Sequence, residues 1–578
     1  MASFLYSPPL KSLTPELLTQ LKERSEKFLF EIIGTNWKSQ FCQTADELSI
    51  FRHAVETLHD DEEGFLQKFR KLVPLTVYDT YEPYVARFFN EPCQEAEVIN
   101  LFAPGFPAFL AASSATSGKA PKFFAKYRGT TYRSLDTQGQ RIHTYRLTCR
   151  VLNVFNGDQD IVRRITASAA SGGLLRLKNG WNPEQDEDIM SSKGKFPTEA
   201  APIAVAMVGY IPSFFLLHAL FGLADRSVET LDLLFCTTLL DLFMYMDRDW
   251  FTLVDAIDNG TIPELKNIEH VRDQLQRHLH ADPVRAAELR AIGPPSNTAG
   301  WAKSVWKNLR LARSVGSGPF SSAVPKVKHL LGPDVILQSP RFASSECFIG
   351  VKYHTGDLNR FRIVLDDGFI EYLELASEEV ADNLCAAWEA EPGRHYELVL
   401  TTCHGLWRYR SGDIVELLGF APDDGSPVVR FVERRKVEIR LDGIFVTEGQ
   451  LAQSIYSVTQ DTIGQVVEFT CFKDVRKLPH TIGFFVELAQ EPGTASRHLA
   501  KQQLVDALSS VNEYVSGQYA RGAMGMPTLR VVKPGTFTEY RKWRGEAAAI
   551  ATLQLKVPVV MSDPIAQEWM INRVELEI

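Results

Sequence analysis

The feature that most constrains the fold is an alternation of helical and strand-rich blocks that restarts late in the chain. The blocks follow in this order: helical residues 13–90, short strands over 97–180, helical residues 200–315, and short strands between 334 and 403. A turn rich in Pro, Asp and Gly at 421–427 precedes a second, smaller pattern of the same mixed type. We therefore predict an α/β protein, with a large mixed domain over residues 1–432 and a smaller α/β domain over 433–578.

Two segments carry more specific predictions. The stretch from Ile203 to Leu223 is almost uncharged and long enough to span a bilayer, but Gly209 and Pro212 interrupt it. It is therefore predicted to form a buried pair of helices. The turn Asp366-Asp367-Gly368 lies between two strand-like runs and predicts a β-hairpin.

Composition excludes several classes of protein. The chain has 578 residues and is 45% hydrophobic, so large cores are expected. Its net charge of −9 argues against a general binder of nucleic acids or anionic membranes, because such proteins need a basic surface. The eight cysteines are scattered without a Cys-x-x-Cys pair, which argues against a zinc site or a disulfide framework. The N-terminal segment lacks the apolar stretch of a secretory signal. We expect a soluble, cytoplasmic monomer.

The first candidate for chemistry is a run of small polar residues that ends in a lysine, Ser113-Ser114-Ala115-Thr116-Ser117-Gly118-Lys119, with Lys122 close behind. Small residues let a phosphate approach the backbone N–H groups, and the lysines neutralise its charge. The run is not a Walker loop, because Ser113 replaces the first glycine and Ala120 follows the lysine. The alternative interpretation is a flexible polar turn.

The second candidate is Phe342-Ala343-Ser344-Ser345-Glu346, just after an apolar run. The aromatic ring can stack on an adenine, a hydroxyl can contact the nucleotide, and Glu346 can hold Mg²⁺. The alternative is an ordinary helix N-cap.

Three further charged residues complete the candidate set. Asp413, after a Gly-rich turn that starts at Gly405, can accept hydrogen bonds from ribose hydroxyls; otherwise it belongs to an exposed Arg–Asp pair. Arg434, at the expected linker, can reach the same ribose, unless it belongs to a solvated basic face. Lys556, within Gln-Leu-Lys-Val-Pro, can stabilise charge that builds between a carboxylate and an α-phosphate, unless it is an ordinary strand lysine.

The order of these motifs resembles that of adenylate-forming enzymes of the firefly-luciferase type. Within that superfamily the chain resembles the auxin-responsive Gretchen Hagen family of acyl acid amido synthetases. The matching stretches run nearly end to end: LVPLTVYDTYEPYVARF, SSATSGKAPK, DWFTLVDAIDNG, FASSECFIG, YELVLTTCHGLWRYRSGDIV, and PGTFTEYRKWRG with the later QLKVP.

The resemblance implies a fold, cofactors and roles. The fold is a large domain of β-sheets or a β-barrel flanked by helices, followed by a mobile C-terminal domain. ATP and Mg²⁺ are the implied cofactors. Ser113, Ser114, Thr116, Ser117 and Gly118 would line the ATP phosphates, Phe342 and Ser345 would contact the nucleotide, Glu346 would lie near the metal, Asp413 would bind the ribose, Arg434 would sit at the hinge, and Lys556 would be the mobile catalytic lysine.

Two positions depart from the family pattern. Ala115 stands where the phosphate loop usually has glycine, and Phe445 stands where a lysine is usual. Ala115 would make the approach of the backbone to the phosphate tighter, and Phe445 bears on the lysine contact from the second domain and with it on the substrate set. Together they motivate one alternative: a non-catalytic relative that binds nucleotide or acyl acid.

We predict an ATP-dependent ligase that converts a carboxylic acid into an acyl-adenylate with release of pyrophosphate. It then transfers the acyl group to an amine, expected to be that of an amino acid. A thiol such as coenzyme A, or a hydroxyl, is the alternative acceptor. The apolar region 200–250 suggests an apolar or aromatic acid, although apolar helices more often form core. A dinucleotide-binding enzyme is disfavoured, because Gly316-Ser317-Gly318 has Ser321 at the last position of that motif.

Overall fold

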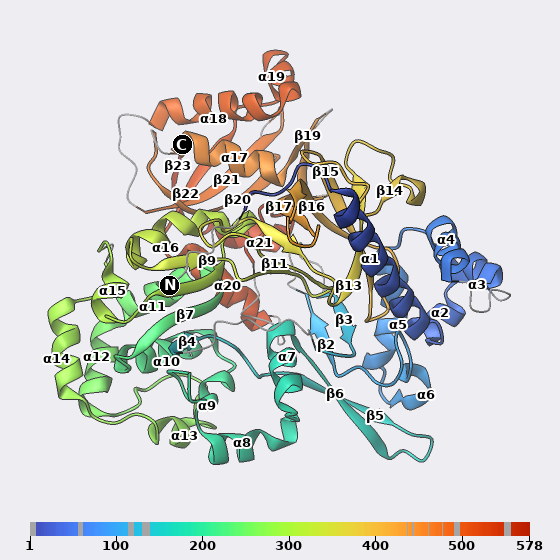
Figure 1. Ribbon diagram of the computed structural model, residues 1–578. Coiled ribbons are helices and arrows are strands. Elements are labelled where there is room, and N and C mark those ends of the chain that lie inside the picture. Colours follow the sequence, from blue (N-terminus) through green and yellow to red (C-terminus); the bar gives the residue numbers. More distant parts are fainter. Residues whose placement is uncertain are drawn as a thin grey trace.

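The computed structural model describes residues 7–55, 62–113, 121–129, 139–296, 298–435, 437–441, 444–459, 462–476, 478–489, 497–547 and 556–578. These residues form a mixed α/β structure, as predicted, built around several separate sheets (Figure 1). The sheets matter here because their edges meet around one cavity.

The N-terminal helices cover an antiparallel sheet of eight strands. They are α1 (Pro15–Asn36), α2 (Gln40–Thr44), α3 (Ser49–Val55), α4 (Glu62–Leu72) and α5 (Tyr78–Val85). Helix α1 begins where Thr14 accepts a hydrogen bond from the Leu17 N–H and Pro15 occupies the first turn. Leu29 and Phe41 share a buried core with Tyr372 of the sheet.

The eight strands follow the spatial order β10 (Arg341–Ala343), β11 (Phe348–Lys352), β12 (Phe361–Ile363), β17 (Pro427–Arg434), β16 (Tyr409–Phe420), β15 (His395–Thr402), β13 (Gly368–Glu374) and β14 (Leu384–Cys385). Strands β12 and β13 are not neighbours in this order, so the hairpin predicted at Asp366-Asp367-Gly368 is wrong. The physical reason is that Asp367 is buried and accepts a hydrogen bond from the Phe348 N–H, which leads the chain across the sheet. The proposed domain boundary at 432/433 lies within β17 and stays a prediction.

A second sheet consists of four parallel strands, in the order β4 (Gln140–His143), β7 (Val228–Phe235), β8 (Leu311–Val315) and β9 (Ile336–Gln338). The segment 228–235 was expected to continue a helix. It instead forms a central strand of the parallel sheet, in which every residue is buried or half-buried. The flanking helices are α8 (Asp186–Lys193), α9 (Ile203–Ala206), α10 (Ile211–Ala224), α11 (Cys236–Arg248), α12 (Trp250–Asn259), α13 (Arg272–Gln276), α14 (Pro283–Ile292), α15 (Trp301–Val305) and α16 (Val324–Leu331).

Helices α9 and α10 occupy the apolar stretch 203–223 and are buried in the core beside the parallel sheet, as predicted. Helix α10 carries apolar residues all round, which suits a helix enclosed on every side. Within the described part of the chain, no helix is long and apolar enough to cross a bilayer.

A third sheet has the order β1 (Cys93–Gln94), β5 (Arg150–Phe155), β6 (Ile161–Ala169), β2 (Phe109–Ala112) and β3 (Phe123–Lys126). Strands β2 and β6 run parallel, so Ala112 and Ala169 end side by side. Helix α6 (Glu95–Val98) lies near β1, and α7 (Ala170–Asn179) follows β6 directly.

The C-terminal residues form their own sheet and cores, drawn in orange and red in Figure 1. The strands are β20 (Val466–Asp474), β21 (Thr481–Leu488), β22 (Thr528–Val532) and β23 (Val574–Glu577), and a hairpin of β18 (Glu438–Leu441) and β19 (Ile444–Thr447) precedes them. The helices are α17 (Glu448–Thr459), α18 (Arg497–Val511), α19 (Glu513–Ala520), α20 (Thr536–Ala547) and α21 (Pro564–Ile571). Val467 packs against the core beside the parallel sheet, so the two parts of the molecule touch.

Candidate active site

A cavity of about 820 Å³ opens where the sheets meet. Three of its aromatic walls follow the carboxyl ends of successive parallel strands: Phe235 ends β7, Phe320 lies in the 3₁₀ turn Gly318–Ala323 after β8, and Phe342 lies on β10 after β9. The carboxyl edge of a parallel sheet is the usual place for a ligand, because loops there leave the sheet and enclose a crevice.

The cavity gathers residues that the sequence scatters over more than 400 positions. Of the sequence-predicted set, it is lined by Ser113, Phe342, Ser345, Glu346, Asp413, Arg434 and Lys556. Ser114, Thr116, Ser117 and Gly118 lie outside the described residues, as does Ala115. Their assignment to the ATP phosphates stays a prediction.

Ser113 directly follows the end of β2, and two hydrogen bonds to Lys122 fix its position. Its N–H donates to the Lys122 carbonyl at 2.7 Å, and its Oγ accepts from the Lys122 N–H at 3.0 Å. Ser345 Oγ donates to the Ala112 carbonyl at 3.2 Å, one residue before Ser113. The segment 342–346 belongs to the β10–β11 hairpin rather than to a helix, so the N-cap alternative is wrong.

Asp413 and Arg434 face each other across neighbouring strands. They are paired in the register of β16 and β17, with Arg434 Nε 3.5 Å from Asp413 Oδ1 and Arg434 Nη2 4.0 Å from Glu346 Oε1. Burial raises the pKa of the Asp413 carboxyl, although Arg434 opposes this. Asp413 in turn raises the pKa of the Arg434 guanidinium. Arg434 therefore carries its charge inside the cavity, and the interpretation of it as part of a solvated basic face is wrong.

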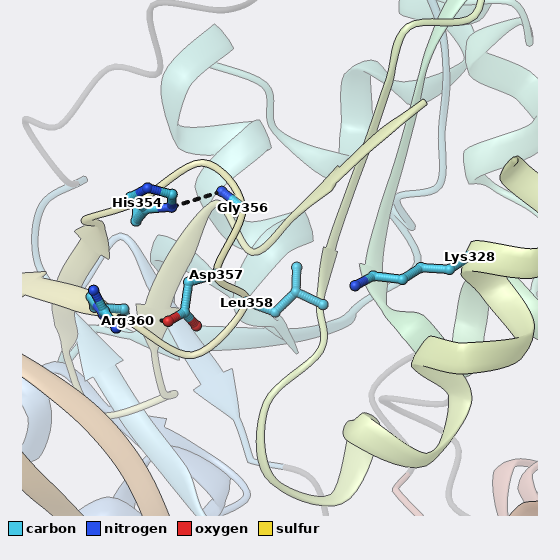
Figure 2. Close-up of a pocket in the computed structure, with 6 residues that line it drawn as sticks. All are labelled: Lys328, His354, Gly356, Asp357, Leu358 and Arg360. Atoms are coloured by element: carbon cyan, nitrogen blue, oxygen red, sulfur yellow. Dashed lines mark hydrogen bonds and ion pairs between the residues drawn. The ribbon is translucent and has the colours of Figure 1, made fainter. Parts of the chain in front are cut away.

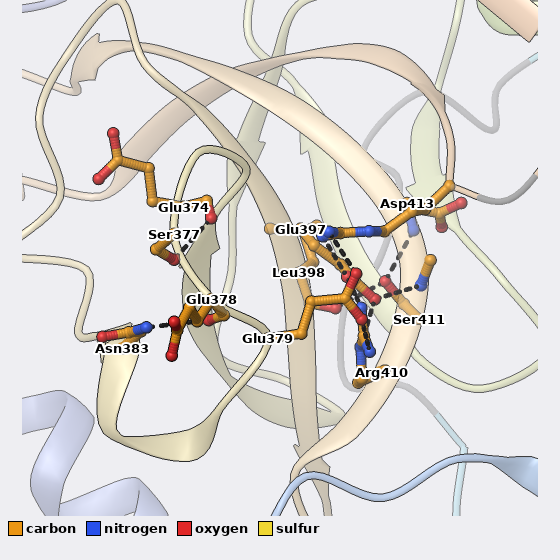
Figure 3. Close-up of polar contacts among 12 residues, drawn as sticks. Glu374, Ser377, Glu378, Glu379, Asn383, Glu397, Leu398, Arg410, Ser411 and Asp413 are labelled. Carbon is orange, nitrogen blue, oxygen red and sulfur yellow. Dashed lines mark hydrogen bonds and ion pairs between the residues drawn. The ribbon is translucent and has the colours of Figure 1, made fainter. Parts of the chain in front are cut away.

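Behind Asp413 lies a network that the sequence analysis missed, shown in Figure 3. The buried Glu397 carboxylate accepts from Arg410 at 2.7 Å, from Arg435 at 3.0 Å and from the Gly412 N–H at 3.3 Å. Ser411 Oγ donates to the Leu398 carbonyl and accepts from the Asp413 N–H. One carboxylate thus fixes both the turn that presents Asp413 and the residue after Arg434. The only signal in the sequence was that Arg410 lies shortly before Asp413 and that Arg435 directly follows Arg434.

The adjacent Arg408 is buried, as is Asp413, so the alternative of an exposed Arg–Asp pair is also wrong. Arg408 makes a bidentate pair with Glu371, at 2.9 and 2.7 Å, and donates to the Arg70 and Val73 carbonyls. Gly405 at the start of the turn adopts a φ of +87°, and a Cβ there would lie 2.2 Å from the Phe102 carbonyl oxygen. Only glycine fits that position.

Lys556 reaches the cavity from the C-terminal part of the chain. Its Nζ lies 5.2 Å from the Phe235 ring centre and 4.9 Å from that of Phe320, whose rings stack on each other. Burial, reinforced by Arg434, lowers the pKa of Lys556 to about 8. The faces of the two rings compensate part of the lost hydration of the ammonium.

Glu448, at the start of α17, is a second group that the sequence analysis missed. It lines the same cavity. Burial raises its pKa to about 7, although Lys556 and Arg434 pull it down. The cavity therefore receives an acid and a base from the C-terminal part, besides Asp413 and Glu346 from the sheets.

The floor of the cavity is polar. Lys126 Nζ donates to the Glu346 carbonyl at 2.9 Å and lies 3.9 Å from the Asp367 carboxylate. Burial opposes ionisation of Asp367, but His404 and Lys126 outweigh it and hold the pKa at about 2. Burial lowers the pKa of His404 to about 4, so this imidazole is neutral at pH 7. These groups hold the turn between β10 and β11 that carries Glu346.

A second, shallower hollow of about 450 Å³ lies elsewhere, on α16 and the connection between β11 and β12 (Figure 2). Its polar groups bond mainly to one another: His354 Nδ1 accepts from the Gly356 N–H at 3.0 Å, and Arg360 pairs with Asp357 at 3.3 Å. The sequence-predicted residues lie in the other cavity, so we assign the chemistry there.

Comparison with protein families decides the relationship. The GH3 family N-terminal domain matches residues 14–336, its central domain matches 361–434, and its C-terminal domain matches 450–565. The chain belongs to the GH3 family. This confirms the sequence-based resemblance.

Relatives of this GH3 protein are named as amido synthetases, in agreement with the predicted acid–amine ligase. Indole-3-acetic acid-amido synthetase GH3.8 of Oryza sativa subsp. indica is 24% identical over 587 residues, which cover 97% of this chain and 91% of that protein. Jasmonoyl–L-amino acid synthetase JAR4 of Nicotiana attenuata is 28% identical over 334 residues, 55% of this chain and 56% of the relative. Among solved structures, the GH3.15 acyl acid amido synthetase superposes with a TM-score of 0.77 at 20% identity, over 97% of this chain and 96% of that one, which shows the shared fold.

The departure at Phe445 lies outside the cavity. Among the described residues that line the cavity, Phe445 is absent; its side chain lies on β19 and is 57% exposed. In this GH3 protein Lys556 is the lysine that the described C-terminal residues bring to the cavity, so the lysine missing at 445 leaves the described cavity wall unchanged.

Proposed function

We propose that this GH3 protein uses ATP to activate a carboxylic acid as an acyl-adenylate and passes the acyl group to the amine of an amino acid. The observation that carries the proposal is the convergence of Phe342, Asp413, Arg434 and Lys556 on one cavity. They supply an aromatic face, a buried carboxylate and two cations, which are the groups that an adenosine and a reacting α-phosphate require. Membership of the GH3 family supports the amide as product.

In the first half-reaction a carboxylate oxygen attacks the α-phosphorus of ATP, and the bond from that phosphorus to the pyrophosphate oxygen breaks. Asp413 accepts hydrogen bonds from the ribose hydroxyls, and Phe342 packs against the adenine. The Lys556 ammonium and the Arg434 guanidinium lie where negative charge accumulates as pyrophosphate leaves. No protein nucleophile is required, because positioning of the reactants and stabilisation of the developing charge account for the acceleration of the reaction.

The charge of ATP implies a Mg²⁺ ion, and the chemistry of one wall suits it. Glu346 offers a hard carboxylate oxygen on the cavity surface, and Mg²⁺ in such sites takes one or two carboxylates besides phosphate oxygens and water. Bound there, the ion would neutralise phosphate charge. Glu346 itself is held by the hydrogen bond from Lys126 to its carbonyl.

In the second half-reaction the amine nitrogen attacks the carbonyl carbon of the acyl-adenylate. The carbon–oxygen bond to phosphate breaks, AMP departs with the bonding electrons, and the amine loses one proton. Cavity walls of Phe109, Leu174, Leu234 and Phe235 are apolar and favour an apolar or aromatic acid. Of the apolar region 200–250, only Leu234 and Phe235 are among the described lining residues.

The test is pyrophosphate release with Mg·ATP against a library of aliphatic and aromatic acids in the presence of amino acids, with products identified by mass. Acid-dependent release with an amide product is the expected result. Release with a thioester or ester instead, when coenzyme A or alcohols are added, would move the acceptor to a thiol or hydroxyl. If folded protein that binds ATP releases no pyrophosphate with any acid of the library, the alternative of a non-catalytic binding protein is favoured.

A further inference from the structure

We propose that Asp241 and Arg541 are positioning residues: they fasten helix α20 to helix α11 in the arrangement that brings Lys556 into the cavity. The inference rests on the proposed function, and it goes further by assigning these two residues to one half-reaction. Neither side chain is among the described residues that line the cavity. Their effect on chemistry must therefore pass through the placement of the C-terminal part.

The contact joins two parts of the chain that are 300 positions apart in sequence. Arg541 Nε donates to Asp241 Oδ2 at 2.9 Å, and Arg541 Nη2 donates to Asp241 Oδ1 at 2.6 Å. Thr538, one turn earlier on α20, donates its hydroxyl to the same Asp241 oxygen at 2.7 Å. Figure 1 shows the red α20 beside the green helices of the parallel-sheet region. Both partners of the ion pair are nearly buried, with side chains 11% and 6% exposed.

Arg541 is also tied to the C-terminal sheet. Its Nη1 donates to both oxygens of Glu468 on β20, at 2.7 and 2.8 Å. Three residues further along β20, the Cys471 N–H donates to the Val559 carbonyl at 2.7 Å, and the Met561 N–H donates to the Cys471 carbonyl at 2.7 Å. Thr470 Oγ1 donates to the Pro558 carbonyl at 2.6 Å. A continuous set of contacts therefore runs from Asp241 through Arg541 and β20 to the segment that starts at Lys556.

Other contacts of the same interface are weaker. Lys542 Nζ lies 5.5 Å from the ring centre of Tyr210, and Val467 packs against the core beside the parallel sheet. A cation over an aromatic ring contributes less than a buried bidentate pair. Among the described residues, the Asp241 pair is the best-defined polar link between α20 and α11.

The charge arrangement makes this link reversible. Burial opposes the charge of Arg541, but Asp241 and Glu468 outweigh it and raise the pKa of the guanidinium. If the C-terminal part turns away, Arg541 keeps Glu468 as its partner, because both residues belong to that part, while Asp241 regains water. Opening therefore leaves no buried charge unpaired, which is the usual reason that breaking a buried ion pair is costly. Such a link favours one arrangement without making it permanent.

The experiment compares Asp241→Asn with Asp255→Asn. The control removes an acid that pairs with Arg290 at 2.8 Å on the exposed side of neighbouring α12, away from α20. For each variant, acid-dependent ATP–pyrophosphate exchange reports adenylation, and amide formation from a synthetic acyl-adenylate reports transfer. We expect Asp241→Asn to lower exchange about 5-fold or more, in the range of ordinary coupling between distant sites, and to leave transfer equal or faster. Asp255→Asn leaves both unchanged.

A second readout separates failure of this inference from failure of the proposed function. Acetylation of Lys556 by an N-hydroxysuccinimide ester, measured by peptide mass, reports its exposure without any catalysis. Labelling is expected to rise in Asp241→Asn and, more weakly, in Thr538→Val, which serves if the first variant folds poorly. Equal losses in both half-reactions, or unchanged labelling in both folded variants, would overturn the proposal. A parent protein that never releases pyrophosphate refutes the proposed function, while the labelling still decides the role of Asp241.

Discussion

Lys556 combines the catalytic role proposed for it with an unusual ionisation. Because burial and Arg434 lower its pKa to about 8, the ammonium that the first half-reaction uses is present below that pH and lost above it. We therefore expect kcat/KM for adenylation to fall by about tenfold per pH unit once the pH exceeds about 8. Lys556→Arg keeps the charge, so this fall in kcat/KM should disappear. Lys556→Met removes the charge, so its kcat/KM for adenylation should be low at every pH. An unaltered pH profile in the arginine variant would assign the fall to another group.

Asp413 gives the second prediction at this scale. Asp413→Ala removes the acceptor for the ribose hydroxyls, and two hydrogen bonds to a charged group contribute roughly 3–6 kcal/mol, so adenylation falls by about 100-fold or more. The Arg434 side chain is 33% exposed and its guanidinium still has the Glu346 carboxylate at 4.0 Å, so we expect the variant to stay folded. The matched control is Asp423→Ala, which removes an exposed partner of Arg362 and leaves the rate unchanged. ATP turnover that survives in folded Asp413→Ala contradicts the assigned nucleotide site.

At the scale of elements, the buried pair of Arg408 and Glu371 fixes the start of β16. The guanidinium lies within the sheet and its cover of helices, so Glu371→Gln leaves a charge there without its partner. Removing one partner of such a pair lowers the free energy of unfolding by about 3–5 kcal/mol. Glu264→Gln, at an exposed partner of Arg272, changes it by less than about 1 kcal/mol. Urea unfolding of both variants checks this, and similar midpoints would show that the site tolerates the lost charge.

Elements were predictable from sequence where their pattern is local. The helix-rich N-terminus follows from apolar spacing, and the buried helices of 203–223 follow from a nearly uncharged run that Gly209 and Pro212 interrupt. The strand 228–235 was not predictable, because it continues without a break signal into α11 and the local pattern therefore predicts one long helix. The hairpin wrongly predicted at Asp366-Asp367-Gly368 also reflects the limits of local sequence. A turn signal reports local geometry, whereas the placement of β13 beside β15 is decided by the buried Asp367 and by long-range pairing.

The candidate site was predictable as a set of residues but not as an arrangement. Phe342, Glu346, Asp413, Arg434 and Lys556 came from motifs that resemble those of a known family. Glu397 and Arg541 lie inside two of the family-like stretches, and Glu448 and Asp241 do not stand out either, because nothing in the sequence assigns a role to a residue that acts through a partner elsewhere in the chain. Such residues emerge only when three-dimensional contacts are known.

At the scale of the whole molecule, the cavity exists because strands from the large part and a segment from the C-terminal part meet. A non-reactive ATP analogue should therefore hold the two parts together. We expect saturating analogue, at about 100 times its Kd, to stabilise the fold by about 2.7 kcal/mol, and to slow hydrogen exchange in both β16 and β20. Asp413→Ala should abolish both effects at the same concentration. Slower exchange in β16 alone would mean that nucleotide binds without engaging the C-terminal part.

The shared carboxylate of Glu397 has a consequence for how variants of this protein should be classified. It holds the turn that presents Asp413 and, through Arg435, the chain that leads to the C-terminal part. We expect a change at this one position to alter both the pre-organisation of the proposed ribose site and the placement of the C-terminal part. Weak nucleotide binding and a displaced C-terminal part would then both result from one substitution. A screen of variants that scores the two effects separately would count the same defect twice.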